Sequence, residues 1–263
     1  MSKLSGKVIV ITGASGGIGK EIAIQSARLG ARLVLLARSL DKLQTLKESL
    51  TSQYGVDVFV WKLDVSDTEQ VERVFVDIHD QVGTVDVLVN NAGHGTFKEV
   101  LDTDLEESKG MFAVNVIGLM ACTKFVLPHM KRKQAGHIIN IASQAGKIAT
   151  PKSTLYSATK FAVLGYSNAL RLELMEDNIH VTTVNPGPIE TNFFTIADES
   201  GTYMKGIKKF MLKPEDVAAK IVAAMLTNKR EVNLPAWMNM VSKFYTLFPR
   251  ITETVGKKAF FKK

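Results

Sequence analysis

The feature that most constrains the fold of this chain is a regular alternation of two residue patterns. Short apolar runs are predicted as strands at residues 7–12, 32–37, 56–64, 85–90, 137–142 and 180–185, with a seventh at 230–235. The runs are continuous rather than alternating, which is typical of strands covered on both faces. Helical patterns separate them at residues 17–29, 41–53, 67–81, 105–132, 154–177 and 214–227, with Asp41 and Asp67 as expected N-caps. The alternation predicts an α/β fold, a doubly wound parallel sheet of about seven strands with helices on both faces.

The 263-residue chain has no Pro/Gly/Ser-rich linker and no internal repeat, so we expect one domain. We assign residues 1–234 to a unit that binds a dinucleotide and carries the catalytic residues. Within it, residues 188–212 interrupt the alternation after the sixth strand, where a segment can cover a ligand bound beyond the strand ends. Residues 235–263 form an extension rich in aromatic and basic residues.

Composition excludes several other classes of protein. Hydrophobic residues make up 46% and charged residues 22%, which is typical of a globular protein with a large core. Cys122 is the only cysteine, so no internal disulfide can form, and the five histidines have no metal-ligand spacing. The first residues do not form a signal peptide, and the uncharged stretch 110–123 is too short to span a bilayer. We therefore expect a cytoplasmic protein without a metal.

The net charge is +7, and basic residues cluster at 131–133, at 205–209 and at the C-terminal end. Such clusters are usually solvated, although they also attract anions such as a phosphorylated cofactor, nucleic acid or lipid headgroups. Aromatic residues do not interleave with the lysines and arginines as they do on a nucleic-acid-binding surface. We therefore expect no nucleic-acid partner.

The first predicted strand runs directly into "TGASGGIG" at residues 12–19. Gly13, Gly17 and Gly19 permit a tight turn and a close approach of the backbone to a ligand. The helix that follows points its free N–H groups at the same place, and these groups suit a phosphate. An isolated glycine pattern is often an ordinary turn, but this position between a first strand and a first helix predicts a Rossmann-like dinucleotide site.

The end of the second predicted strand selects between two cofactors. An NAD site usually has an acidic residue there, whereas an NADP site has a basic one. This chain has Ala37 followed by Arg38, and its next acidic residue is Asp41. Arg38 can bind a 2′-phosphate through its planar guanidinium, although it could also simply end the strand. We predict NADP(H) in preference to NAD(H).

Further polar motifs follow the other predicted strands. They are "LDV" at 63–65, "NNAG" at 90–93, Ser143, the pair Tyr156 and Lys160 in "YSATK", and "NPGPIET" at 185–191, with Asn115 midway along the long helix. The glycine loop at 12–19, NNAG, Asn115, Ser143, Tyr156 with Lys160, and the PG at 186–187 occur in an order and spacing that resemble those of the short-chain dehydrogenase/reductase family, over nearly the whole chain. The resemblance implies an oxidoreductase that acts on a carbonyl or alcohol group.

The resemblance also implies roles for individual residues. Tyr156 would be the general acid/base, Ser143 would orient the substrate oxygen, and Lys160 would bind the nicotinamide ribose and stabilise tyrosinate. Asn115 would support a proton relay through water. The remaining cofactor contacts would come from loop residues, namely Gly13, Ser15, Gly17, Ile18, Gly19, Asp64, Val65, Asn91, Ala92, Gly93, Pro186, Gly187, Ile189 and Thr191. Asn90 and Asn91 could instead chiefly hold the turn and the sheet together.

Simple electrostatics explains why Tyr156 and Lys160 stand four residues apart. On a helix they share a face. Poising a phenol with a pKa of about 10 near neutrality needs roughly 4 kcal/mol of stabilisation of its anion. One ammonium at about 4 Å supplies that order of energy at an effective dielectric constant of about 20.

One departure from the family weakens the prediction of strict NADP use. Many NADP-preferring members have a basic residue in the glycine loop where this chain has Gly16, so the preference rests on Arg38. A non-catalytic NADP(H) sensor on the same fold is the alternative function, because fold alone does not settle activity.

Two regions of the sequence indicate what the protein binds. Phe97, Phe193, Phe194 and Met204 suggest an apolar substrate pocket, and we expect a homodimer or homotetramer. In the extension, six residues could form the apolar side of a helix: Trp237, Met240, Phe244, Tyr245, Leu247 and Phe248. That side would pack on the body or on a second subunit. Alternatively, with the terminal lysines, it would make peripheral contact with an anionic membrane.

Overall fold

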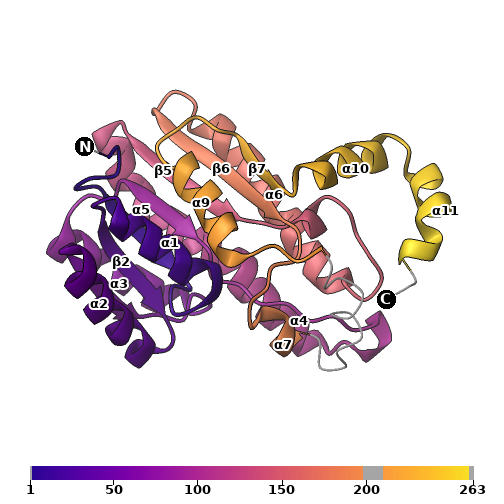
Figure 1. The fold of residues 1–263 in the computed structure, drawn as a ribbon, viewed down its shortest axis with the longest axis horizontal. Helices are drawn as coiled ribbons and strands as arrows, with labels where there is room; N and C mark the ends of the chain where they lie inside the picture. The colour runs from indigo at the N-terminus through magenta and orange to yellow at the C-terminus, as the bar shows by residue number, and fades with distance from the viewer. Residues whose placement is uncertain (1, 198–209, 261–263) are drawn as a thin grey trace.

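The computed structural model describes residues 2–197 and 210–260. Its centre is one parallel sheet in the order β3-β2-β1-β4-β5-β6-β7 (Figure 1). The strands are β1 (Val8–Thr12), β2 (Arg32–Ala37), β3 (Val58–Lys62), β4 (Val87–Asn90), β5 (Gly136–Ile141), β6 (Ile179–Pro186) and β7 (Glu231–Leu234). The sheet confirms the predicted doubly wound, Rossmann-like fold with seven strands.

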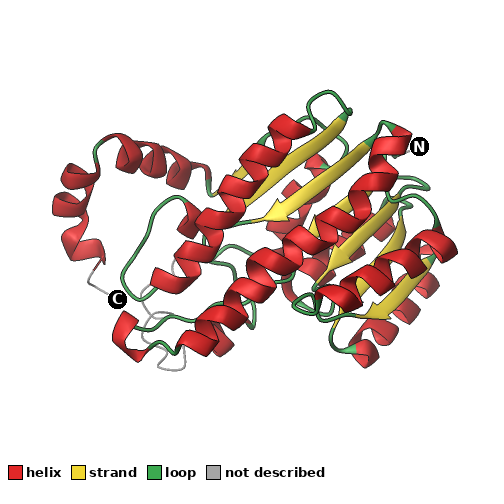
Figure 2. Ribbon diagram, turned by 180° about the vertical axis from the view of Figure 1, so that it is seen from behind, coloured by secondary structure: helices red, strands yellow, loops and turns green. Residues whose placement is uncertain are grey.

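Helices cover both faces of the sheet. One apolar layer joins it to α1 (Gly17–Arg28), α2 (Leu40–Tyr54) and α9 (Pro214–Ala224). The other joins it to α3 (Thr68–Val82), α5 (Leu119–Lys133) and α6 (Thr154–Glu173) (Figure 2). Within β1, Ile9 and Ile11 belong to the first layer, whereas Val8 and Val10 belong to the second. Alternate side chains point to opposite faces, so a strand that is buried on both sides needs a continuous apolar run.

The strand order reverses between β1 and β4. The chain leaves β1 toward β2 and β3 on one side, and the later strands add on the other side. Ligands of open α/β sheets bind at such a switch point, beyond the carboxyl ends of the strands. The loops after Thr12 and Asn90 therefore open onto the crevice where a cofactor is expected.

The helix predicted at 105–132 is not a single regular helix. The chain forms α4 (Leu105–Phe112), a π-helical segment η2 (Ala113–Gly118) and then α5. Residues Leu105–Lys133 are long and apolar enough to cross a membrane, but half of the most apolar window is buried inside the protein. Cys122 in α5 is buried, and this burial raises the pKa of its thiol to about 12, as expected for an inert thiol.

The two predicted N-caps have different outcomes. Asp67 caps α3, and its side chain accepts a hydrogen bond from the Gln70 N–H at 2.9 Å. The prediction for Asp41 is wrong, because Ser39 is the N-cap residue of α2 and Asp41 lies in the first turn. An acidic residue there still favours the helix by interacting with its positive end.

Short elements complete the catalytic side of the sheet. They are the 3₁₀ turns η1 (Val100–Asp102) and η3 (Gln144–Gly146) and the helix α7 (Phe193–Ala197). The insertion predicted at 188–212 is described at 188–197 and 210–212, and Met204 lies outside the described residues.

The C-terminal extension forms two helices that extend away from the sheet. These are α10 (Ala236–Leu247), which contacts β7 and η3, and α11 (Pro249–Phe260), which contacts α10. In Figures 1 and 2 both helices project from one end of the molecule. Most of their described apolar side chains are exposed to solvent.

Candidate active site

The glycine loop joins β1 to α1 with little free space. Gly13 and Gly17 have φ angles of +66° and +52°, which L side chains rarely adopt. A Cβ at Gly19 would lie 2.5 Å from the Gly13 carbonyl oxygen and 2.6 Å from Asn91 Nδ2. The N-cap of α1 is Gly16, which has no side chain to cap the first N–H groups. These groups are therefore available to an anion, and the loop fits a phosphate-bearing ligand.

The turn after β4 is held against this loop by Thr12 and Asn91. The Thr12 hydroxyl oxygen accepts the N–H groups of Asn91 and Ala92 at 3.0 and 2.9 Å. Asn91 Nδ2 donates to the carbonyl oxygens of Thr12 and Gly13 at 2.9 and 3.2 Å. Asn90 Nδ2 donates to Thr123 Oγ1 and Asn140 Oδ1. Both asparagine side chains thus hold the turn and the sheet together, as the alternative interpretation expected.

No motif in the sequence assigns Thr12 a separate role. Its only signal was its position immediately before the glycine loop. Ser15 is half-buried in that loop, and Ile18 packs against the apolar layer beneath α1.

Arg38 and Asp64 lie at the ends of β2 and β3, on the side of the crevice away from Tyr156. Arg38 is exposed, and its positive charge acts on Asp64. Burial opposes ionisation of Asp64, but hydrogen bonds from the Ser66 hydroxyl and N–H, together with the charge of Arg38, lower its pKa. The neighbouring Val65 is buried against η2, where a Cβ on Gly118 would lie 2.5 Å from the Val65 carbonyl oxygen.

Tyr156 and Lys160 occupy the first two turns of α6. The Lys160 ammonium lies 5.7 Å from the centre of the Tyr156 ring and donates to the Ile141 carbonyl oxygen at 2.9 Å. Lys160 is buried, and this burial lowers its pKa from 10.5 to about 8. The predicted proximity of phenol and ammonium is therefore present, on a buried helix face rather than an exposed one.

Ser143 follows β5 and begins the η3 turn. Its hydroxyl oxygen accepts the Ala145 N–H at 3.0 Å, and the hydroxyl donates to the Pro186 carbonyl oxygen at 3.4 Å. The side chain is only 9% exposed, so its position is defined before any substrate binds.

The π-helical segment places Asn115 beneath the loop after β4. Asn115 Oδ1 accepts the His94 N–H at 2.9 Å, and Nδ2 donates to the His94 carbonyl oxygen at 2.8 Å and to Thr159 Oγ1 at 3.1 Å. A Cβ on Gly93 would meet Asn115 Oδ1 at 3.1 Å and Lys160 Nζ at 3.7 Å. Asn115 and Lys160 therefore both lie next to Gly93.

Aromatic side chains surround the Tyr156 ring. The ring centres of Phe97 and Phe193 both lie 5.6 Å from it, and Phe194 packs on Phe97 at 5.6 Å. A Cβ on Gly95 would lie 2.8 Å from Phe193 and 2.9 Å from Tyr156, so only glycine fits there. Three of the four predicted apolar residues thus lie together around the phenol.

The loop after β6 carries the last group of predicted cofactor residues. Ile189 pairs with Leu212 in an isolated β-bridge and is buried. Thr191 lies against the glycine loop, since a Cβ on Gly17 would be 3.5 Å from Thr191 Cγ2. Gly187 lies against α10, where its Cβ would be 2.9 Å from Met238 Sδ.

The pKa of His94 reflects the charged side chains around it. Burial lowers its pKa, the positive charges of Arg38 and Lys160 lower it further, and Glu107 and Asp64 act in the opposite direction. The positive charges of Arg38 and Lys160 therefore both act at His94, and a positive field of this kind suits an anionic dinucleotide. The sequence alone did not single out His94, because it directly follows the uncharged motif at 90–93 and no charged residue adjoins it along the chain.

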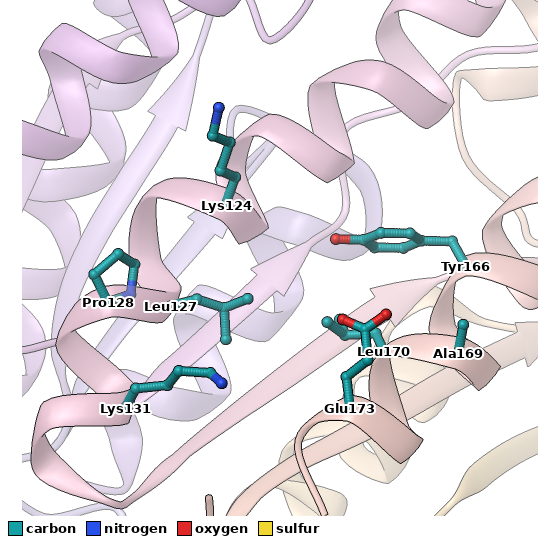
Figure 3. Close-up of a pocket in the computed structure, with 8 residues that line it drawn as sticks. All are labelled: Lys124, Leu127, Pro128, Lys131, Tyr166, Ala169, Leu170 and Glu173. Atoms are coloured by element: carbon teal, nitrogen blue, oxygen red, sulfur yellow. The ribbon is translucent and has the colours of Figure 1, made fainter.

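A cavity of about 470 Å³ lies elsewhere, between α5 and α6 (Figure 3). Lys124 and Lys131 line it from α5, and Tyr166 and Glu173 line it from α6. Tyr166 stands ten residues beyond Tyr156 on the same helix, which corresponds to about 15 Å. This cavity is therefore separate from the candidate active site.

Proteins similar to this chain include dehydrogenases. The family model described as short chain dehydrogenase matches residues 7–200. A Schizosaccharomyces pombe protein named NADP-dependent 3-hydroxy acid dehydrogenase is 37% identical over 239 residues, which are 88% of this chain and 91% of that protein.

Two solved structures show the same fold. An alcohol dehydrogenase from Thermococcus sibiricus, complexed with 5-hydroxy-NADP, is 32% identical with a TM-score of 0.79, over 88% of this chain and 96% of that one. A short chain dehydrogenase/reductase from Burkholderia phymatum in complex with NAD has a TM-score of 0.87 over 95% and 96% of the two chains. At 24% identity, the second likeness supports the fold alone.

Proposed function

Because the chain belongs to the short-chain dehydrogenase/reductase family, we propose that it transfers hydride between NADP(H) and a carbonyl or alcohol substrate. One observation carries the proposal: the Lys160 ammonium lies 5.7 Å from the centre of the Tyr156 ring, and the η3 turn that Ser143 begins packs on the same helix. The glycine loop, whose free N–H groups suit a phosphate, contacts the loop after β4 against which Lys160 lies. Fold alone would not distinguish an enzyme from a sensor, but this set of side chains has the chemistry of proton transfer to oxygen.

Each side chain has a separate task in the proposed mechanism. In carbonyl reduction the Tyr156 phenol donates its proton to the substrate oxygen, and in alcohol oxidation it takes that proton back. The Ser143 hydroxyl donates a hydrogen bond to the same oxygen as negative charge develops on it. When bound, the nicotinamide supplies or accepts the hydride at the substrate carbon.

Lys160 and Asn115 support these steps. The Lys160 ammonium would donate to the ribose hydroxyls, and its charge would stabilise tyrosinate. Asn115 would take part in a proton relay through water, while its side-chain amide holds His94 in place. The buried position of both residues keeps competing water away from the phenol.

The proposed cofactor site runs along the whole crevice. The glycine loop would hold the phosphates, Arg38 the 2′-phosphate, and Asp64 and Val65 the adenine. The loop with Asn91, Ala92 and Gly93, and the loop with Pro186, Gly187, Ile189 and Thr191, would hold the nicotinamide half. The exposed guanidinium of Arg38 and the NADP named for the two relatives above 30% identity support NADP(H).

The proposed substrate is hydrophobic. Phe97, Phe193 and Phe194 line the approach to the phenol with aromatic surface, and Met211 packs on the same cluster. A compound with an apolar group next to its carbonyl would bury that group there.

We propose a cytoplasmic enzyme in which residues 1–234 hold the site, 188–212 cover it, and 235–263 form an extension.

We also propose a homo-oligomer, a dimer or a tetramer. The outer face of α6 exposes Phe161 and Leu172, which are 47% and 65% accessible. The neighbouring cavity in Figure 3 carries Lys124 and Lys131 from α5 and Glu173 from α6, and a two-fold arrangement would bring these charges against a second copy. Sedimentation velocity of the protein and of Phe161→Glu tests this; an unchanged oligomer would contradict it.

Replacing Tyr156 with Phe tests the activity. The Tyr156→Phe variant keeps the ring and its contacts with Phe97 and Phe193 but loses the proton, so turnover should fall by about 10³-fold. NADPH oxidation with a panel of aldehydes, ketones and 3-oxoacyl compounds measures the loss, and NADPH fluorescence checks that the cofactor still binds. Near-normal turnover would reject the role of Tyr156. A wild type that binds NADPH but reduces no carbonyl would support the sensor instead.

A further inference from the structure

Helix α10 has its apolar side facing solvent. Its exposed large residues recur at the spacing of one helix face: Trp237, Met240, Val241, Phe244, Leu247 and Phe248. Met240 and Leu247 are 74% and 71% accessible, and Ile251 and Val255 extend the apolar surface onto α11. We call these eight residues the apolar stripe. A stripe of this kind on a surface helix normally faces a core, so its exposure marks an interaction site.

The opposite face of α10 is the one that contacts the body. Ser242 is its only buried side chain, and Met238, Asn239 and Tyr245 are half-buried. Asn239 Oδ1 accepts from the Lys147 ammonium at 3.4 Å, and Lys147 pairs with Glu231 on β7 at 2.6 Å. These contacts fix the orientation of α10, so the apolar stripe is directed outward by the fold.

Helix α10 begins beside the loop after β6. On its body-facing side Met238 lies against Gly187 in that loop, and on the stripe Trp237 packs on Phe210 with ring centres 6.2 Å apart. Phe210 belongs to the insertion at 188–212. The apolar surface is thus continuous with Phe210, and α10 reaches the loop after β6 that carries the proposed nicotinamide contacts.

The charge of the extension favours an anionic surface over a second copy of the chain as the partner. Residues 235–263 contain six basic residues and one acidic residue, Glu253, and so carry +5 of the chain's net +7. A second copy would bring like charges together, whereas an anionic surface would attract them. Apolar residues with lysines and arginines on one helical segment are typical of helices that lie in the headgroup region of a membrane.

We propose that α10 and α11 dock on an anionic phospholipid membrane, with the apolar stripe in the headgroup–acyl boundary. The rest of the domain stays in the aqueous phase above it. Because α10 adjoins the loop that carries the proposed nicotinamide contacts, the enzyme takes an apolar carbonyl or alcohol substrate from the bilayer. This second statement rests on the proposed function, whereas the docking itself does not.

Flotation of the full-length protein with NADPH bound tests the docking. Vesicles of phosphatidylglycerol and phosphatidylcholine in equal parts should carry the protein upward, and vesicles of phosphatidylcholine alone should carry far less. Phe244→Glu with Leu247→Glu should lower the bound fraction at least about tenfold, since two apolar anchors are lost. Lys243→Glu with Arg250→Glu should lower it by a similar factor on anionic vesicles.

Matched controls separate this surface from general effects of charge or hydrophobicity. Val76→Glu changes an exposed apolar residue on α3, and Lys42→Glu changes an exposed charge on α2, and both should float as the wild type does. Turnover of a water-soluble carbonyl should be unchanged in every variant, so a loss of turnover alone would bear on the proposed function and not on docking.

Two results would overturn the proposal. The first is a wild-type protein that does not float with anionic vesicles, or a Phe244→Glu/Leu247→Glu variant that floats equally well. The second is a wild-type protein that ignores vesicles but self-associates through the stripe, which sedimentation of the same variant would reveal. That outcome would assign the surface to a second copy of the chain.

Discussion

The two ends of the crevice are built differently. At the catalytic end, Asn115, Ser143 and Lys160 are each less than a tenth exposed, and hydrogen bonds fix their polar atoms. At the adenosine end, Arg38 is exposed and acts on Asp64 through charge. Proton transfer requires fixed geometry, whereas discrimination between two cofactors requires only a charge of the right sign. Substitutions at the buried end should therefore cost far more activity than substitutions at the exposed end.

After Tyr156→Phe, the largest expected effect is that of Lys160→Met. The variant keeps the length of the side chain but removes the ammonium, so turnover should fall about 10²- to 10³-fold in the NADPH oxidation assay. Lys160→Arg keeps the charge and serves as the matched comparison. Turnover of the Met variant within a few-fold of wild type would contradict the proposed role.

The same substitution should stabilise the protein at neutral pH. Burial lowers the pKa of Lys160 from 10.5 to about 8, so between these values the unfolded chain binds more protons than the folded one. The wild-type free energy of unfolding therefore rises with pH across this range, and below pH 8 the full cost of the buried charge is present. The Met variant loses the hydrogen bond to Ile141, but it also loses the cost of the buried charge. Its free energy of unfolding, measured in urea at pH 7, should therefore exceed that of the wild type by about 1–2 kcal/mol. The gain should shrink as the pH rises toward 10.5, and a variant less stable at pH 7 would contradict the argument.

At the exposed end, Arg38→Asp should change preference without abolishing activity. A charge-assisted bond to the 2′-phosphate contributes about 1.5–3 kcal/mol, so the ratio of kcat/KM for NADPH over NADH should fall about 10- to 100-fold. Maximal turnover at saturating cofactor should stay near the wild-type value. An unchanged ratio would remove Arg38 from cofactor selection.

A smaller effect on turnover is expected from replacing Lys147, near Ser143. Lys147 follows the η3 turn that Ser143 begins, and its ammonium contacts Glu231 Oε2 at 2.6 Å and Asn233 Oδ1 at 2.9 Å. Burial opposes ionisation of Glu231, but the hydrogen bonds from Lys147 and Asn233 lower its pKa. Lys147→Met should lower kcat about tenfold with little change in the KM for NADPH, because Ser143 loses its support. Lys147→Arg should restore most of kcat; if it does not, Lys147 is not a positioning residue.

The smallest effect on activity is expected at the start of α3, where the Asp67 side chain bonds its own helix and has no proposed role toward the cofactor. Asp67→Ala removes the side-chain cap of α3 and should lower the free energy of unfolding by about 1 kcal/mol. Its kcat/KM should equal that of the wild type. A marked loss of activity would show that the site depends on the stability of the whole domain rather than on its local contacts.

Much of the fold could be predicted because its cause is local. A strand buried on both faces must be apolar throughout, and seven such runs separated by helical patterns leave few architectures. Boundaries were less predictable: Ser39 and Asp41 both suit an N-cap, and only the backbone shows that Ser39 is used. The π-helical turn at Asn115 had no signal either, since an extra residue per turn does not change composition.

The candidate site was predictable in outline for a topological reason. Residues that follow parallel strands meet at one edge of the sheet, so Ser143 and the loop after Asn90 had to approach each other. The contacts of Thr12, His94 and Thr159 depend on tertiary packing. The residues next to them in the sequence do not predict these contacts. Similarly, the periodicity of α10 indicated an apolar side but not the direction in which that side faces.

The close approach of Gly118 to the Val65 carbonyl oxygen links the two ends of the crevice. Val65 belongs to the loop that carries Asp64, and Gly118 ends the turn that carries Asn115. Any side chain at position 118 would push these segments apart, and so would disturb the proposed adenine site and the proposed proton relay together. Attempts to redesign the cofactor preference of this protein should therefore keep Gly118 and the backbone of residues 64–65 unchanged, and confine mutations to exposed side chains such as Arg38.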